Sequence, residues 1–130
     1  MESNNFSIKN MAKGNPAIAG LPFASMKEAV LGENYELSLV FAPKNTLREL
    51  NRTHRGKDVA TDILSFPLSN SAGEIFINLD EAKKEAKKFD RKFENFVGFL
   101  FIHGLVHLKG YAHGSRMEAQ EKKFRRGFNI

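Results

Sequence analysis

The chain has 130 residues, of which 42% are hydrophobic and 27% are charged, and it contains twelve phenylalanines but no cysteine. This length fits one domain with a single core, the apolar content argues against disorder, and the lack of cysteine excludes disulfides and thiolate metal sites. The formal net charge of +5 favours a polyanionic partner such as nucleic acid.

The elements expected in chain order alternate between strands and helices. They are a strand over 6–10, a helix over about 17–31 that ends at Gly32, a strand over 36–41, a helix from Thr46 to Arg52, strands over 61–67 and 74–78, and helices over about 80–89, 92–109 and from 115 onward. A turn between the last two strands predicts a hairpin.

Several single residues are expected to mark the limits of these elements. Pro67 should close its strand, Asp80 should cap the helix that follows it, and Ser115 with Glu118 fits a capping box. The polar, glycine-containing segment 55–60 is expected to be a loop.

The predicted helix over 92–109 is apolar on nearly all sides, so it belongs in the core. The order of elements therefore predicts a single α+β domain over residues 1–130, with a small mixed sheet of about four strands packed by helices.

Two features of the chain bear on its location. The apolar run Phe96–Ile102 is far shorter than the ~20 residues needed to cross a bilayer. The first residues, 1–5, lack the basic and apolar regions of a secretion signal. A cytoplasmic protein without a membrane span is expected.

The stretch from His103 to His113 contains three of the chain's four histidines. His103 and His107 are four residues apart, so on a helix their imidazoles project from one face, one turn apart. Gly110 stands where a helix can end at positive φ, after which the chain can double back and bring His113 to the same point. Three neutral imidazoles suit one tetrahedral zinc ion with an open fourth position, at the C-terminal end of a buried helix. The alternative is that they are ordinary polar residues.

The residue after the first histidine limits the chemistry of such a site. Metzincin metalloproteases use this histidine spacing with a glutamate directly after the first histidine as the general base. In this chain that position is Gly104. A metal hydrolase of this kind must find its proton acceptor elsewhere, or act on a substrate whose reaction depends more on charge neutralisation.

Three blocks of the sequence resemble the YbeY family, which are bacterial endoribonucleases involved in ribosomal RNA maturation. The resemblance spans about residues 36–121, most of the chain. The three blocks are His103-Gly104-x-x-His107-Leu108-x-Gly110-Tyr111-x-His113, Asn51-Arg52-x-x-Arg55-Gly56-x-Asp58-x-x-Thr61-Asp62-Ile63-Leu64-Ser65-Phe66-Pro67 and Gly73-Glu74-Ile75-Phe76-Ile77.

The resemblance implies one zinc ion per chain, bound by His103, His107 and His113, and a catalytic role for Arg55 in the same cleft. It also implies an α+β fold, and a single-strand-specific endoribonuclease that acts in the cytoplasm on a ribosomal RNA precursor. The expected roles are maturation of the 3′ end of 16S ribosomal RNA, ribosome biogenesis and ribosome quality control, with the small ribosomal subunit as partner.

Other residues of these blocks have weaker expected roles. Asp62 and Ser65 could face the cleft and bind substrate, or could be structural. His54 is expected to be an exposed loop residue, and Tyr111 to pack beside the metal loop. Ala112 stands where the family usually has aspartate, and Ser115 could substitute for it as a helix cap.

Two other functional classes stay open from the sequence. A metzincin-like hydrolase of another substrate would explain the histidines but not Gly104. A non-catalytic RNA-binding or ribosome-binding metalloprotein would explain the positive charge, and Ala112 is compatible with it.

Overall fold

The computed structural model describes residues 5–12, 18 and 20–130. The elements in chain order are β1 (Phe6–Asn10), α1 (Phe23–Leu31), β2 (Glu36–Phe41), α2 (Lys44–Arg55), β3 (Ile63–Ser69), β4 (Ala72–Ile77), α3 (Leu79–Lys88), α4 (Phe93–Leu108) and α5 (Ser115–Gly127). This order confirms the predicted α+β class with four strands.

The four strands form one mixed sheet in the order β1-β2-β4-β3. The pairs β1–β2 and β2–β4 are parallel, and β3–β4 is antiparallel, which confirms the predicted hairpin. Within the described residues, β1 and β3 are therefore the two edge strands of this sheet.

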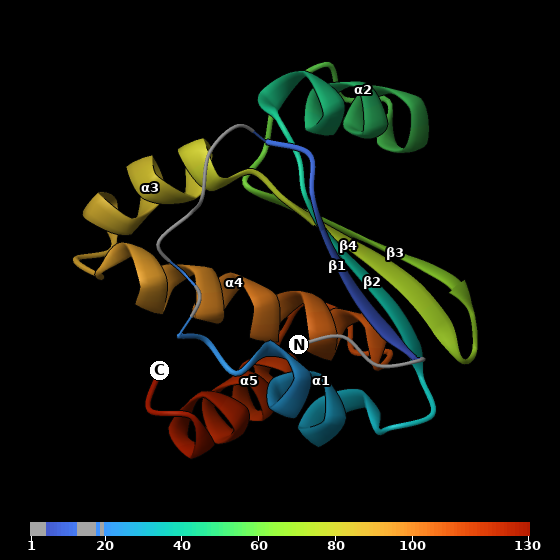
Figure 1. Cartoon of the computed structure of the whole chain (residues 1–130), viewed down its shortest axis with the longest axis vertical. Coiled ribbons are helices and arrows are strands. Elements are labelled where there is room, and N and C mark those ends of the chain that lie inside the picture. Colours follow the sequence, from blue (N-terminus) through green and yellow to red (C-terminus); the bar gives the residue numbers. More distant parts are fainter. Residues whose placement is uncertain (1–4, 13–17, 19) are drawn as a thin grey trace.

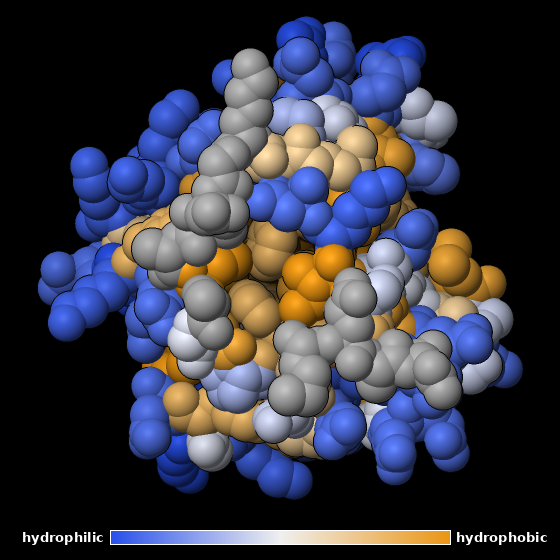
Figure 2. All heavy atoms as spheres, in the orientation of Figure 1, coloured by the Kyte–Doolittle hydropathy of each residue, from blue (hydrophilic) through white to orange (hydrophobic). Residues whose placement is uncertain are grey.

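Helix α4 lies across one face of the sheet, with α1 and α5 packed beside it, whereas α2 lies beyond the end where the parallel strands finish (Figure 1). In α4, the side chains of Phe101, Ile102 and Leu105 are fully buried, as expected for a helix that is apolar all round. Hydrophobic residues gather at the centre of the view, and hydrophilic ones cover α2 and α3 (Figure 2). In the described part of the chain, no helix has the length and apolarity to span a membrane.

Gly104 of α4 packs directly against the sheet. A Cβ atom at this position would stand 3.0 Å from Cδ1 of Ile75 and 3.1 Å from Cδ1 of Ile63. The position after the first histidine of the motif therefore points into the packed interface, where a glutamate side chain would have no room and its charge would be buried.

We expect Gly104→Val to lower the free energy of unfolding by about 1–3 kcal/mol, because the added methyl groups would force Ile63 and Ile75 out of place. Urea denaturation measures this change. Gly127→Val is the matched control, since that glycine is exposed and a Cβ there would meet nothing within 4 Å. Equal unfolding midpoints for the two variants would contradict the tight packing described for Gly104.

Two helix boundaries differ from the sequence prediction. Helix α1 begins at Phe23, because Pro22 occupies its N-cap and a residue before proline avoids helical geometry. Of the earlier residues in the predicted range, 18 and 20–22 are not helical, and 17 and 19 lie outside the described residues. Helix α2 continues through Arg55, since the helix ends only where Gly56 adopts φ of 68°. The prediction of a loop at Arg55 was therefore wrong.

The limits of the hairpin were also misjudged. Strand β3 continues past Pro67 to Ser69, with a register irregularity between them, because an edge strand tolerates a residue without an N–H donor. Strand β4 already begins at Ala72, so Gly73 is a strand residue and not part of the turn.

Both predicted helix caps were wrong. The side chain that caps α3 is Asn78, whose Oδ1 accepts a hydrogen bond from the Glu81 N–H at 2.7 Å, whereas Asp80 lies inside the first turn. Helix α5 has Gly114 at its N-cap with no side-chain hydrogen bond, and Ser115 is its first helical residue. The glycine at φ of 150° sets this boundary, so a capping box does not form.

Candidate metal and active centre

Helix α4 carries His103 and His107 near its C-terminal end, one turn apart. Both side chains are half-buried, unlike the fully buried residues around them. After α4 ends, Gly110 adopts φ of 112°, and the chain turns back toward the helix. The helical spacing of the two histidines and the turn at Gly110 are therefore as predicted from the sequence.

The turn brings the ring of His113 against the rings of the two helical histidines. Its centroid lies 5.5 Å from that of His103 and 6.1 Å from that of His107, and the planes differ by 28° and 29°. Three imidazoles from two segments therefore gather at one place on the surface of α4.

Each helical histidine has a hydrogen-bond partner on its Nδ1 atom. Nδ1 of His103 lies 3.0 Å from Oε1 of Glu121 on α5, and Nδ1 of His107 lies 3.0 Å from Oγ of Ser65 on β3. A carboxylate accepts a hydrogen bond from the Nδ1–H group, which leaves the Nε2 lone pair of His103 free to bind a cation. This pattern of supporting hydrogen bonds is typical of metal-binding histidines.

Glu121 is the functional candidate that the sequence reasoning missed. It is only 6% exposed, and its carboxylate also lies 3.9 Å from Nη1 of Arg125. A signal was present, because Glu121 falls four residues after the buried Met117 and so lies on the buried face of a predominantly charged helix.

The donor set fits zinc chemically, although the side chains do not form a complete metal-binding geometry as they stand. Among residues 5–12, 18 and 20–130, no three His, Cys, Asp or Glu side chains have such an arrangement. Burial lowers the pKa of His107, and the charge of Arg55 lowers it further. This shift favours the neutral imidazole that a metal ligand must be.

Arg55 lies beside the histidines, at the last residue of α2. Its Nη2 atom donates to the main-chain oxygen of Ser65 at 3.5 Å. Ser65 thus contacts Arg55 through its carbonyl group and His107 through its hydroxyl group. The two segments that contain the predicted catalytic and metal-binding residues meet at this one serine.

Asp62 directly precedes the strand β3 and is half-buried. Burial raises the pKa of its carboxyl group, and the nearby Glu85 carboxylate adds to the rise, while His103 opposes it. The main-chain oxygen of Asp62 accepts a hydrogen bond from the Asn78 N–H at 2.9 Å, which fixes the loop to the end of β4.

The remaining residues of the motif lie at the edge of this cluster. Tyr111 is half-buried and packs against the main core, and Ala112 is exposed. His103 and His107 already have partners in Glu121 and Ser65, so their orientation does not depend on an acid at position 112.

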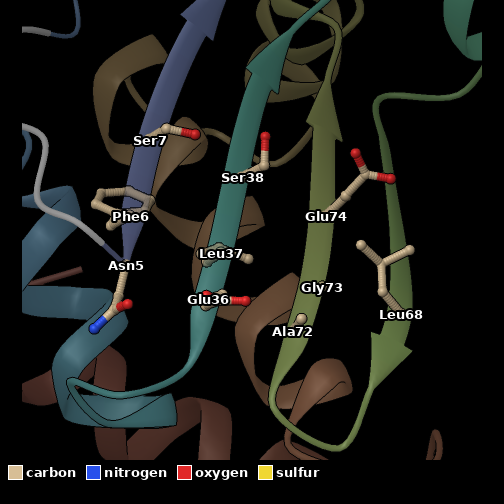
Figure 3. Close-up of a pocket in the computed structure, with 10 residues that line it drawn as sticks. All are labelled: Asn5, Phe6, Ser7, Glu36, Leu37, Ser38, Leu68, Ala72, Gly73 and Glu74. Carbon is tan, nitrogen blue, oxygen red and sulfur yellow. The ribbon is translucent and has the colours of Figure 1, made fainter.

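A separate pocket of about 270 Å³ lies on the other face of the sheet, away from α4 (Figure 3). Ser7, Ser38 and Glu74 line this pocket from β1, β2 and β4, while α4 and α5 lie behind the strands (Figure 3). The histidine cluster does not contribute to its lining.

Comparisons with known proteins find sequence similarity to proteins named Endoribonuclease YbeY. Endoribonuclease YbeY of Alkaliphilus metalliredigens is 42% identical over 103 residues, which cover 71% of this chain and 66% of that protein. The protein of the same name from Lysinibacillus sphaericus is 36% identical over 118 residues, covering 79% and 73%. The solution structure of a Thermotoga maritima protein matches with a TM-score of 0.65 and 27% identity, covering 92% and 85%.

The chain spans just under two thirds of the length of the A. metalliredigens relative and 60% of the relative from Alkaliphilus oremlandii. The family model described as Endoribonuclease YbeY matches residues 5–127, almost the whole chain. The chain therefore belongs to the endoribonuclease YbeY family.

Proposed function

We propose that this chain is a zinc-dependent, single-strand-specific endoribonuclease. The observation that carries the proposal is the gathering of His103, His107 and His113 beside Arg55, with Glu121 and Ser65 on the Nδ1 atoms of the helical pair. The names of the relatives and the net charge of +5 support RNA as the substrate.

The proposed biological role follows from family membership. It is cytoplasmic maturation of the 3′ end of 16S ribosomal RNA, with contributions to ribosome biogenesis and quality control. The partners would be the ribosomal RNA precursor and the small ribosomal subunit.

The three histidines would hold the metal ion, one per chain. Such an ion supplies a Lewis acid and a water of lowered pKa for attack on a phosphodiester. Arg55 is always cationic and presents a planar fork of donors, so it suits the charge that develops on the phosphoryl oxygens. Its hydrogen bond to the Ser65 carbonyl holds the guanidinium beside the histidines.

We assign different roles to Ser65 and Asp62, the two residues proposed for substrate binding. The Ser65 hydroxyl group already bonds to His107, so we assign it to orienting that histidine. Asp62 stays a candidate substrate-binding residue, because its half-buried carboxyl group directly precedes β3, the strand that carries Ser65.

The packing of Gly104 argues against the metzincin-like alternative. A glutamate at this position would collide with Ile63 and Ile75 instead of facing the site. Assays for RNA and casein cleavage on the same preparation test both this alternative and the non-catalytic one. Cleavage of casein without cleavage of RNA would overturn the proposed function, as would RNA binding without cleavage by metal-loaded protein.

RNA binding by the chain should fall steeply as salt is added, because the contacts to phosphates release counterions. On single strands, each lost phosphate contact lowers the slope of log affinity against log salt by about 0.7. We expect Arg55→Gln to show this decrease in fluorescence anisotropy titrations, and Lys84→Gln on helix α3 to show less, because Lys84 is paired with Glu81. Binding of the wild-type chain that does not respond to salt would contradict an electrostatic RNA site.

Glu121→Ala is expected to weaken zinc binding by about 10–100-fold, because His103 would lose the carboxylate that orients its ring. Competition with a zinc-binding dye measures the affinity. Glu118→Ala is the control, since Glu118 is on the same helix but exposed. Equal affinities for the two variants would show that the Glu121 carboxylate has no role in metal binding.

A further inference from the structure

His54 is an exposed histidine outside the metal cluster. It was predicted to be a loop residue, but it lies in the last turn of α2, directly before Arg55. Its imidazole packs against the ring of Phe66 on β3, with centroids 4.9 Å apart and planes at 47°. The guanidinium carbon of Arg55 lies 5.9 Å from the centroid of the same phenyl ring.

Phe66 and Ser65 lie on opposite faces of β3, because neighbouring side chains of a strand alternate. Ser65 faces α4 and bonds to His107, whereas Phe66 faces the α2 side and packs edge-on against Phe76 at 6.0 Å. The ring of Phe66 is half-buried by these neighbours. It therefore provides a fixed support behind the exposed imidazole of His54.

Arg55 connects these two faces. It contacts the Ser65 main-chain oxygen and the Phe66 ring, so its guanidinium lies at the outer side of the edge strand β3. A polyanionic strand whose phosphate contacts Arg55 beside the histidines would place its next groups within reach of His54.

Adjacent residues of α2 thus offer two kinds of contact that suit one nucleotide. The guanidinium of Arg55 suits a phosphate, and the exposed face of the His54 ring suits a flat base. Bases of a single strand can splay out and stack on aromatic side chains, whereas bases in a duplex are stacked on their neighbours.

We propose that His54, supported by Phe66, is a base-stacking platform for the nucleotide whose phosphate contacts Arg55. The proposal rests on the proposed RNA-cleaving function and adds a subsite to it. Stacking accepts every base, so the subsite contributes affinity and a preference for single strands without strong sequence preference.

The test uses the metal-loaded protein and labelled single-stranded RNA oligonucleotides of one sequence, each with one abasic nucleotide at a different position. On the intact oligonucleotide, His54→Ala should raise the half-saturating RNA concentration by about 5–150-fold, and His54→Tyr should restore it to near the wild-type value. With one abasic oligonucleotide, the wild-type protein should lose the same factor, and His54→Ala should lose nothing more.

Phe89→Ala is the control, because Phe89 is 59% exposed and stacks on Phe96. It is the C-cap of α3, and that end of α3 lies away from α2 (Figure 1). The variant should leave the half-saturating concentration unchanged. The platform is ruled out if His54→Ala matches the wild-type chain on intact RNA, or if it is weakened by the same factor on every abasic oligonucleotide.

Failure of the proposed function gives a different result. A wild-type chain that cleaves none of these oligonucleotides would overturn the nuclease assignment. Anisotropy with the same labelled oligonucleotides would still measure whether the effect of His54→Ala depends on one base.

Discussion

Replacing Arg55 with alanine is expected to lower the single-turnover rate of RNA cleavage by about 10²–10³-fold, as does the loss of a preorganised donor elsewhere. The reason is that the guanidinium, besides contacting a phosphate of the bound RNA, would stabilise the additional charge that develops on the phosphoryl oxygens in the transition state. Metal content and the unfolding midpoint should barely change, because Arg55 is exposed and contacts Ser65 only through its carbonyl oxygen.

Two further variants separate catalysis from charge alone. Arg55→Lys should restore little of the rate, since a point charge cannot reproduce the bidentate fork. Arg52→Ala is the matched control, because Arg52 lies one turn earlier on α2 and pairs with Glu49. An unaltered rate for Arg55→Ala at saturating enzyme would mean that Arg55 positions the substrate and is not catalytic.

Much of the fold was predictable because local periodicity decides it. The alternation in β2 and the all-round apolarity of α4 reflect burial directly, and both elements were placed within about a residue of their limits. The hairpin of β3 and β4 followed from the short turn between two strand-like segments.

Boundaries and caps failed because their causes lie outside the local pattern. Pro67 reads as a strand end, yet β3 is an edge strand and continues beyond it. Asp80 has the sequence context of a helix cap, but the buried Asn78 caps the helix. The N–H group of Asn78 donates to the Asp62 main-chain oxygen, and this hydrogen bond fixes Asn78 at the end of the sheet. Neither fact can be read from neighbouring residues.

In the candidate site too, some features follow from the local sequence and others depend on tertiary structure. The spacing of His103, His107 and His113 encodes their convergence, since one helix and one glycine turn suffice to produce it. The partners Glu121 and Ser65 come from other elements, α5 and β3, and lie 18 and 42 residues from the histidines that they contact. Contacts of this kind depend on tertiary packing, so local sequence patterns do not predict them.

Replacing His107 with alanine is expected to lower the zinc content from about one ion per chain to nearly none and to abolish RNA cleavage. The loss should exceed the ~10–100-fold effect expected for a supporting residue, because His107 would be one of only three protein ligands. Elemental analysis of the purified variants measures the metal content. His54→Ala is the matched control for the metal content alone, since it removes the fourth histidine but leaves the cluster of three intact.

Thermal unfolding provides a measurement independent of activity. A ligand that binds only the folded state stabilises it by about 2.7 kcal/mol at 100 times its dissociation constant, so a chelator should lower the midpoint of the wild-type chain. The same chelator should leave His107→Ala unchanged, because this variant has no bound ion to lose. Equal zinc contents for the wild-type chain and His107→Ala, with equal chelator shifts, would show that the histidine cluster is not the metal site.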